Sequence, residues 1–294
     1  MPVRDVVLLV NPTANGGRGA ALAGVATDRL TAAGLGVRQL VGRDARESQD
    51  MAYEAAASGA DALVVVGGDG MVHLALQAVG GTEVPFGVIP AGSGNDFARE
   101  LGLPLTDPVA AADVVVGGGE RTVDLGRAGS QWFGGVVAAG FDARVNDRAN
   151  RMRWPSGRLR YNLAILAELG VFRPVPYVLE LDGEVWETSA MLVAIGNSTC
   201  YGGGMRVTPG ALMDDALLDV MVVKPISKAR FLLVFPRVYS GAHVQLPYVE
   251  VRRARQLRVE APGITAYADG ERLGPLPQKF EAVPDAARVL VPAA

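Results

Sequence analysis

The sequence predicts two regions of different fold class, an α/β domain followed by a mainly-β domain. Within the first hundred residues, three short apolar stretches each run into a glycine-rich loop, and helical stretches separate them. This alternation is typical of a Rossmann-like parallel sheet. After Gly117, short β-like stretches separated by Gly, Pro and Asp replace the helical pattern, which indicates an antiparallel, sandwich-like fold. We therefore expect an α/β domain over residues 1–120, with residues 279–294 as a candidate addition to it, and a β-rich domain over residues 121–278.

Composition and charge narrow the class of protein. The chain has 294 residues, of which 49% are hydrophobic, and this is enough for two domains with cores of their own. Its formal net charge is −3 and it has no block of consecutive Lys or Arg, so we expect no nucleic-acid partner. Cys200 is the one cysteine, which excludes an intrachain disulfide. Because neither a leader nor an apolar stretch of ~18 residues is found, we expect a soluble intracellular protein.

The central loop of the α/β domain follows a strand expected from Ala62 to Val66. That stretch is apolar and β-branched, as in a parallel sheet covered on both faces. The glycines of Gly67-Gly68-Asp69-Gly70 let the backbone approach another group closely, and the helix expected from about Val72 offers N–H groups to a phosphate. A bare carboxylate would repel phosphate, so Asp69 is predicted to act through Mg²⁺ or to accept a bond from a ribose or base. The alternative is a tight turn with a solvated Asp69.

The first loop follows a strand expected over Val6–Val10. Residues 11–19 are dense in Asn, Pro and Gly and precede a helix that should end near Ala33. Arg18 is available there to pair with an anion. The loop has neither the Gly-Lys-Ser/Thr of a Walker A loop nor a G-x-G-x-x-G fingerprint, so an ordinary loop is the alternative.

The third loop completes the pattern. A strand over Val37–Val41 and a helix over Asp44–Ser58, which begins with a capping-box spacing, precede the central strand. Pro85–Pro90 then reads as a strand that ends in Ala91-Gly92-Ser93-Gly94-Asn95-Asp96, where Asp96 could simply cap the helix that Phe97 opens. Ligands of open α/β sheets bind beyond the carboxyl ends of the strands, so three glycine loops at such ends predict a nucleotide-binding domain.

The second half is expected to form many short strands with two helical stretches. The helical stretches are Gly157–Phe172 and Lys228–Tyr239. The expected strands are Thr122–Leu125, Trp132–Ala138, Tyr177–Leu181, Met191–Gly196, Leu217–Val223, Val249–Val251, Leu257–Glu260 and Thr265–Ala268.

Motifs along the chain occur in an order and spacing that resemble a known enzyme family. They are Asn11-Pro12 with its glycines, Gly67-Gly68-Asp69-Gly70, Gly92-Ser93-Gly94-Asn95-Asp96-Phe97-Ala98, Gly196-Asn197 ahead of Gly202-Gly203-Gly204, Ala211 to Asp219, and Asp269-Gly270-Glu271. Together they resemble the diacylglycerol kinase catalytic domain, a group that includes bacterial lipid kinases and, more distantly, sphingosine and ceramide kinases. The resemblance covers essentially the whole chain.

The resemblance implies a nucleotide-binding α/β domain, a β-rich lipid-binding domain and an active site in the cleft between them. It implies transfer of the γ-phosphoryl group of ATP to the primary hydroxyl of diacylglycerol, giving phosphatidic acid, with Mg²⁺ as cofactor. A monoacylglycerol or a ceramide- or sphingosine-like alcohol is the alternative acceptor. Phosphoryl transfer needs positioning, charge neutralisation and a carboxylate that accepts the hydroxyl proton, and Mg²⁺ prefers oxygen ligands.

The resemblance also assigns residues to roles. Asp269 would be the general base with Glu271 beside it, although Asp269-Gly270 is also a favourable hairpin turn. A structural Mg²⁺ would be held by the Asp215 carboxylate and the backbone carbonyls of Leu212 and Leu217, although Asp214-Asp215 is also an ordinary loop. Asp69, Asp96 and Asp124 would form an acidic network around the nucleotide Mg²⁺. The nucleotide site as a whole would comprise Asn11, Gly67, Gly68, Asp69, Gly70, Met71, Ser93, Asn95, Asp96 and Asp124.

Three positions depart from the family pattern. Met71 and His73 stand where the family has Thr and Asn, so the preference for the nucleotide is open. Ala216 stands where the structural-metal loop has Gly. If that backbone needs φ > 0, Ala216 is strained and the metal site is weak or empty.

Two other function classes compete with a lipid kinase. NAD kinase shares the Gly-Gly-Asp-Gly loop but should carry an Asn-Glu motif near the middle of the chain, where neither Asn146, Asn150 nor Asn162 precedes Glu. A non-catalytic lipid-binding relative is disfavoured because the candidate catalytic aspartates are all present.

A lipid kinase must also reach a substrate in a bilayer. Residues 154–166 combine Trp154 and Tyr161 with an apolar stripe, and Arg151, Arg153, Arg158 and Arg160 cluster near the start. Such residues favour an anionic membrane surface, whereas a core helix with solvated arginines is the alternative. We expect transient association with the inner membrane surface of a cytoplasmic protein, and leave a homodimer open.

Overall fold

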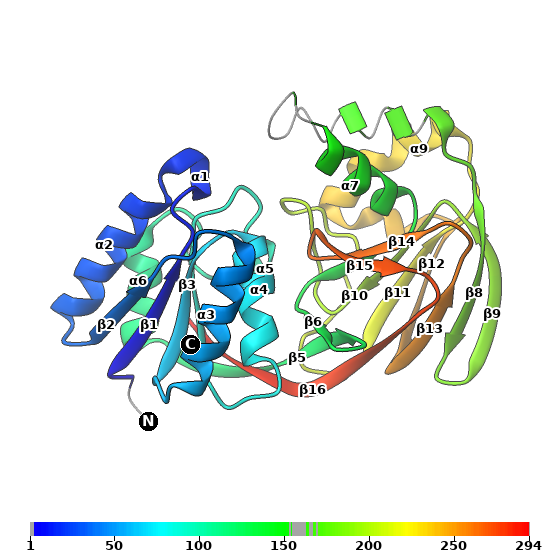
Figure 1. Ribbon diagram of the computed structural model, residues 1–294. Helices are drawn as coiled ribbons and strands as arrows, with labels where there is room; N and C mark the ends of the chain where they lie inside the picture. The colour runs from blue at the N-terminus through cyan, green and yellow to red at the C-terminus, as the bar shows by residue number, and fades with distance from the viewer. Residues whose placement is uncertain (1–2, 153, 155–162, 165–166, 169, 294) are drawn as a thin grey trace. The chain divides into compact units, whose positions relative to one another are not determined.

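The computed structural model describes the chain except for residues 1–2, 153, 155–162, 165–166, 169 and 294 (Figure 1). The chain divides into two compact units. Unit 1 comprises Met1–Leu125 and Val283–Ala294, and unit 2 comprises Gly126–Ala282. The boundaries fall inside strands β5 (Gly119–Ala128) and β16 (Gln278–Val291), so two strands run from one unit into the other.

Unit 1 contains a parallel sheet in the order β2-β1-β3-β4, extended at β4 by the end of β16. Its strands are β1 (Asp5–Val10), β2 (Gly36–Leu40), β3 (Ala62–Gly67) and β4 (Phe86–Pro90). β3 is buried along its whole length and β1 from its second residue on, because helices cover both faces of the sheet. The α/β class predicted for this part of the chain is confirmed.

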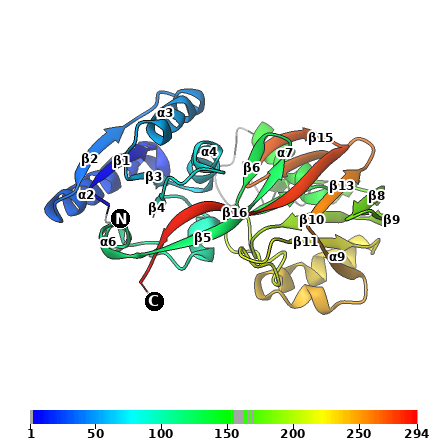
Figure 2. The same cartoon turned by 90° about the horizontal axis from the view of Figure 1, so that it is seen from below.

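The helices of unit 1 pack in two pairs, one on each face of the sheet (Figure 2). α2 (Gly19–Ala32) packs with α6 (Pro108–Gly117), and α3 (Ala45–Ala57) packs with α4 (Asp69–Val79). Two short helices, α1 (Ala14–Gly17) and α5 (Asp96–Glu100), lie in the loops. The Asp44 side chain accepts a bond from the Glu47 N–H and caps α3 as predicted.

α4 begins earlier than the sequence predicts. The expected start was near Val72, but Asp69 is already helical and Gly68 is the N-cap. The Gly68 carbonyl accepts bonds from the N–H groups of Met71 and Val72, so the first helical turn closes within the glycine-rich segment. Asp69 therefore lies in the first turn, where a carboxylate is favoured by the helix dipole.

Unit 2 is a two-sheet β structure, which confirms the predicted sandwich-like fold. One sheet has the order β12-β11-β10-β7-β14-β15, and in the other the start of β16 pairs with β13, followed by β8 and β9. Side chains from both sheets form one core that includes Phe133, Tyr177, Val220 and Phe280. The strands are β6 (Gln131–Phe133), β7 (Val136–Ala138), β8 (Val175–Leu181), β9 (Glu184–Ala190), β10 (Leu192–Gly196), β11 (Leu218–Val223), β12 (Val249–Ala254), β13 (Gln256–Glu260), β14 (Thr265–Ala268) and β15 (Glu271–Pro275).

A second core of unit 2 lies under its helices. Among the described residues, helices with defined bounds are α7 (Phe141–Arg151), α9 (Lys228–Val234), and the 3₁₀ helices η1 (Phe235–Ser240) and η2 (Ala242–Gln245). The helix expected over Lys228–Tyr239 changes from α to 3₁₀ geometry at Phe235, next to Pro236, which has no N–H to continue the α-helical ladder. Much of the helix expected over Gly157–Phe172 lies outside the described residues. In the described part of the chain, no helix is long and apolar enough to span a membrane.

The buried Asp142 of α7 pairs with the half-buried Tyr201 in unit 2. Asp142, in the first turn of α7, accepts bonds from the Ala143 N–H at 2.9 Å and from the Tyr201 hydroxyl at 3.1 Å. Burial raises the pKa of Asp142 to about 7, although both hydrogen bonds favour the charged form. Cys200, beside Tyr201, is also buried, with 3% of its surface exposed.

This raised pKa predicts a pH-dependent stability. A carboxyl with a raised folded-state pKa contributes stability that is complete below its unfolded pKa of ~3.9 and is lost as pH rises through about 7. An Asp142→Asn variant keeps an acceptor for Ala143 but cannot ionise. Relative to wild type, its free energy of unfolding should therefore rise by about 2 kcal/mol between pH ~5 and pH ~8. Urea unfolding at both pH values measures this difference, and parallel pH profiles would show that Asp142 is ionised in the native protein at neutral pH.

Candidate active site

The three glycine loops of unit 1 meet at one edge of the parallel sheet. The Asn11 N–H donates to the Val66 carbonyl at 3.0 Å, and the Ala91 N–H donates to the Gly67 carbonyl at 2.8 Å. These bonds join the ends of β1, β3 and β4, so the loops leave the sheet side by side. The convergence that the sequence predicts at the carboxyl ends of the strands is therefore present.

The second and third loops touch backbone to backbone. A Cβ placed on Gly68 would lie 2.9 Å from the Gly92 Cα, and one placed on Gly92 would lie 2.5 Å from the Gly68 Cα. Real Cβ atoms do not approach this closely, so both positions require glycine for space rather than for a positive φ. The two loops are thus held at a fixed separation.

Asp69 links the same two loops through its side chain. Its Oδ1 accepts the Asp96 N–H at 2.7 Å and the Phe97 N–H at 3.4 Å. These two N–H groups open α5, whose N-cap residue Asn95 has φ 54° and makes no side-chain capping bond. Asp69 therefore caps α5 from a different loop, and Asp96 is the first residue of α5 rather than its cap.

The two asparagines of the predicted nucleotide site shape their own loops. The Asn95 amide closes a ring on Gly92, accepting from its N–H at 2.8 Å and donating to its carbonyl at 3.0 Å. Asn11 Oδ1 accepts from both the N–H and the hydroxyl of Thr13. Met71 is buried, and its side chain lies against Gly67. Gly70 and Ser93 are exposed at the loop surface.

Asp124 is held by a different neighbour from Asp69 and Asp96. It lies on β5 with 3% of its surface exposed, and its Oδ1 accepts the Asp285 N–H at 2.9 Å. Across the described residues, no group of three or more His, Cys, Asp or Glu side chains is arranged to hold a metal ion. The acidic network of Asp69, Asp96 and Asp124 around a nucleotide Mg²⁺ stays a prediction, in which the nucleotide would supply further oxygen ligands.

Asp269 lies in unit 2, in the turn between β14 and β15. Its backbone has φ 52° and Gly270 has φ 88°, as the Asp-Gly hairpin turn predicted from sequence requires. The carboxylate accepts two consecutive N–H groups, that of Gly134 at 3.1 Å and that of Gly135 at 2.9 Å. Both oxygens are thereby oriented by the backbone. Glu271 follows as the exposed first residue of β15.

The loop that fixes Asp269 contains residues to which sequence reasoning gave no role. Asn197, which is fully buried, donates from Nδ2 to the Gly134 carbonyl at 3.1 Å, and its N–H donates to the Gly135 carbonyl at 2.9 Å. A Cβ on Gly135 would lie 2.5 Å from Asp269 Oδ1. The available signal was the Gly134-Gly135 pair inside the single strand expected over Trp132–Ala138, because the structure divides that stretch there into β6 and β7.

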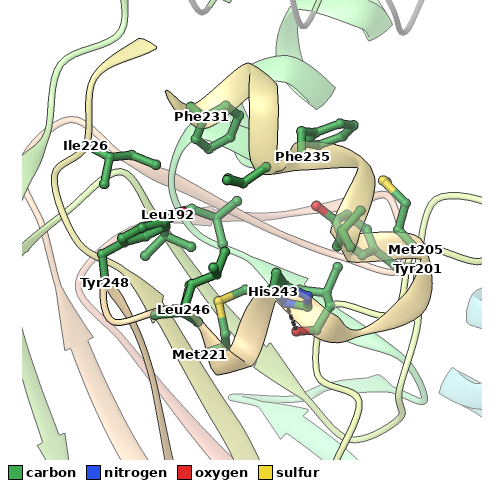
Figure 3. Close-up of a pocket in the computed structure, with 15 residues that line it drawn as sticks. Leu192, Tyr201, Met205, Met221, Ile226, Phe231, Phe235, His243, Leu246 and Tyr248 are labelled. Atoms are coloured by element: carbon green, nitrogen blue, oxygen red, sulfur yellow. Dashed lines mark hydrogen bonds between the residues drawn. The ribbon is translucent and has the colours of Figure 1, made fainter. Parts of the chain in front are cut away.

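An apolar pocket lies under α9 and η1 in the same unit (Figure 3). It encloses about 530 Å³ of empty space, including its opening to solvent. Leu192 and Met221 from β10 and β11 form one wall, and Phe231, Phe235 and Tyr248 lie across from them.

The imidazole ring of His243 lies in the lining of this apolar pocket. Its Nε2 lies 3.0 Å from the Val207 carbonyl oxygen, and burial lowers the pKa of the ring. The remaining residues offer mainly aliphatic and aromatic surface. Such a pocket suits a hydrocarbon chain.

The comparisons with known proteins agree with this arrangement. The family model described as the diacylglycerol kinase catalytic domain matches residues 5–128, and the one described as the YegS C-terminal NAD kinase beta sandwich-like domain matches residues 135–291. A curated protein named diacylglycerol kinase from Mycobacterium tuberculosis is 47% identical to this chain, over 99% of this chain and 96% of that protein. The chain belongs to the diacylglycerol kinase family.

More distant relatives extend the same result. A diacylglycerol kinase of Bacillus subtilis is 29% identical over 80% of this chain and 79% of that protein. A solved structure from Bacillus anthracis str. Sterne superposes with a TM-score of 0.83 at 24% identity, covering 99% of this chain and 96% of that one. The structural likeness supports the fold, and the identity to curated kinases supports lipid kinase chemistry.

At the structural Mg²⁺ site that the family resemblance implies, an arginine side chain competes with the metal ion for Asp215. The Asp215 carboxylate is paired with the Arg253 guanidinium, which also binds Asp219 Oδ1 at 2.9 Å. Ala216 has φ 58°, the strained backbone that its place in the loop suggested. Because arginine already neutralises the Asp215 carboxylate, this donor set does not fit Mg²⁺.

The contact between Gly68 and Gly92 predicts that two Gly→Ala variants differ strongly in their free energy of unfolding. Gly68→Ala should lower the free energy of unfolding by about 1–3 kcal/mol, because its Cβ forces two backbones apart. Gly24→Ala in α2 has open space around it and should instead raise stability by up to ~1 kcal/mol, since alanine favours helix. Denaturant unfolding of both variants measures the contrast, and equal effects would mean that the loops separate freely.

Because Arg253 takes the place of a metal ion at Asp215, the melting temperature of the protein should not depend on Mg²⁺. Nucleotide-free wild type should keep its melting temperature when Mg²⁺ is added, whereas Arg253→Ala should gain a Mg²⁺-dependent rise, because a ligand that binds only the native state stabilises it. Arg255→Ala, an exposed neighbour, is the control and should behave as wild type. A Mg²⁺-dependent rise in wild type that Asp215→Ala removes would restore the metal site.

Proposed function

We propose that this chain is an ATP-dependent diacylglycerol kinase that converts diacylglycerol to phosphatidic acid. The observation that carries the proposal is the Asp269 carboxylate, fixed through both oxygens by the Gly134 and Gly135 N–H groups. The sheet that contains β14 and β15, on either side of Asp269, also contains β10 and β11, which line the apolar pocket. A proton acceptor and a place for a hydrocarbon chain thus occur in one unit of a chain that belongs to a lipid kinase family.

The glycine loops of unit 1 would bind the nucleotide. Phosphate binding at a helix N-terminus uses backbone N–H groups and the helix dipole, and the glycine loop at the start of α4 offers both. Gly70, in the first turn of α4, and Ser93, in the loop before α5, are exposed. The side chains of Asn95 and Met71 instead contact Gly92 and Gly67. ATP would enter with Mg²⁺, which neutralises phosphate charge. Because most of the donors are backbone groups, the Met71 and His73 departures are compatible with ATP binding.

Asp269 would act as the general base in the transfer. The lipid hydroxyl oxygen forms a bond to the γ-phosphorus of ATP while the bond from that phosphorus to the β–γ bridging oxygen breaks, and ADP leaves. The hydroxyl proton passes to the Asp269 carboxylate. The two backbone N–H groups hold the carboxylate in place during this step, which matters because phosphoryl transfer depends on positioning.

Diacylglycerol is the favoured acceptor because a curated relative named diacylglycerol kinase matches nearly the whole chain. Monoacylglycerol and ceramide- or sphingosine-like alcohols share the two chemical features that the site would read, a primary hydroxyl and a hydrocarbon chain. Purified protein should be assayed for ADP release with each lipid in mixed micelles, and with NAD as a non-lipid acceptor. Phosphorylation of NAD, or of no lipid, would overturn the proposal; a higher kcat/KM for another lipid would reassign the acceptor.

The proposal predicts that Asp269→Asn abolishes transfer and leaves nucleotide affinity nearly unchanged. A general base typically contributes ~10²–10⁴ in rate, and its loss should appear in kcat. ADP release under saturating lipid measures kcat, and calorimetry measures nucleotide affinity.

The chain offers a matched control for this variant. Asp182-Gly183, in the turn between β8 and β9, also has positive φ at both residues, and the Asp182 carboxylate also accepts two consecutive N–H groups, from Arg255 and Gln256. Asp182→Asn should cost similar stability and keep kcat within about twofold of wild type. If Asp269→Asn retains more than about half of wild-type kcat, another group is the base.

A further inference from the structure

Helix α9 and η1 are apolar on two sides. On the inner side, Phe231 and Phe235 face the pocket (Figure 3). On the outer side, Leu233 is 80% exposed and Leu232 is 45% exposed, and Tyr239 of η1 is 46% exposed. A helix that is apolar all round is normally surrounded by protein or by lipid. In the part of the chain that the structure describes, the inner side packs on the pocket, whereas these outer side chains are exposed.

The charge of this segment is opposite to that of the chain. Residues 225–249 contain Lys228, Arg230 and Arg237 and no Asp or Glu, whereas the whole chain has a formal net charge of −3. All three cations are exposed. The Lys228 ammonium reaches the Gly170 carbonyl, next to Val171, which is 65% exposed. Exposed aliphatic side chains together with cations, in a segment whose sequence has no anion, are complementary to an anionic lipid surface.

We infer that the outer face of α9 and η1 docks on the surface of an anionic phospholipid bilayer. This face, the α9 face, consists of Lys228, Arg230, Leu232, Leu233, Arg237 and Tyr239. The leucines enter the acyl boundary, and the cations and the tyrosine lie at headgroup level. The inference rests on the proposed function, because the pocket that α9 covers is the place for the lipid chain. One short helix thus has the bilayer on one side and the pocket on the other.

The predicted docking segment around Trp154 lies largely outside the described residues. Arg153, Arg158, Arg160 and Tyr161 lie outside the described residues, so that hypothesis remains a prediction from sequence. Trp154 itself is 80% exposed. The α9 face is argued from described side chains only.

The first test measures binding without turnover. The full chain is sedimented with vesicles of phosphatidylcholine alone and with vesicles of equal parts phosphatidylcholine and phosphatidylglycerol. Wild type should bind the anionic vesicles more tightly, and Leu232→Ser/Leu233→Ser should bind both kinds at least about tenfold more weakly. Val185→Ser on β9, which removes an apolar side chain that is 59% exposed, is the matched control and should bind as wild type.

The second test separates charge from apolar contact. Lys228→Gln/Arg237→Gln should reduce binding to the anionic vesicles by about tenfold and leave binding to phosphatidylcholine unchanged, because each cation near an anionic surface contributes on its own. Arg46→Gln, an exposed cation of α3, should change neither. Added salt should weaken binding of wild type more than that of the charge variant.

Activity assays then connect docking to the proposed kinase reaction. Both α9-face variants should phosphorylate a water-soluble short-chain diacylglycerol as fast as wild type and should show a raised KM only for lipid in vesicles. Equal vesicle binding by wild type and variants would overturn docking even if the chain proves to be a diacylglycerol kinase. Leucine-dependent vesicle binding without any lipid phosphorylation would sustain docking and reject the proposed function. A dimer that the leucine variant breaks, with vesicle binding unchanged, would assign the face to a second copy of the chain.

Discussion

The contact between the backbones of Gly68 and Gly92 is the constraint on which the candidate nucleotide site depends. It brings the ends of β3 and β4 so close that no side chain fits between them. The Asp69 carboxylate then spans the same gap to the first N–H groups of α5. Two helix N-termini are thereby held next to each other. Asp69 itself supplies the carboxylate at the start of α5, so a phosphate would be bound by N–H groups of the glycine loop and of the start of α4.

Asp-Gly turns show how one local geometry is used for two purposes. Asp182 and Asp269 have nearly the same positive φ, and each carboxylate accepts two consecutive N–H groups, from Arg255 and Gln256 at Asp182 and from Gly134 and Gly135 at Asp269. Turn chemistry therefore explains why Asp stands at both positions. It does not explain a catalytic role, which must come from the surroundings. At Asp269 those surroundings are a glycine pair that the buried Asn197 holds in turn.

The sequence was informative where a local pattern implies one backbone geometry. Parallel strands buried on both faces, glycine loops at their ends and the Asp44 cap all follow from residue type and spacing. Contacts between segments far apart in the chain could not be predicted from local residue patterns. The pairing of Asp215 with Arg253 joins residues far apart in the chain, and nothing local to either one signals it. The helix start at Asp69 was missed because three glycines were read as a loop, whereas the structure closes a helical turn within them.

The buried position of Cys200 makes the chain convenient for spectroscopy. It is the one thiol in the sequence, and only 3% of its surface is exposed. A maleimide or spin label added to the native protein would therefore find little to react with. A cysteine introduced at a chosen surface position would carry the label almost alone. An environment-sensitive dye could then report on that position without removal of any native residue.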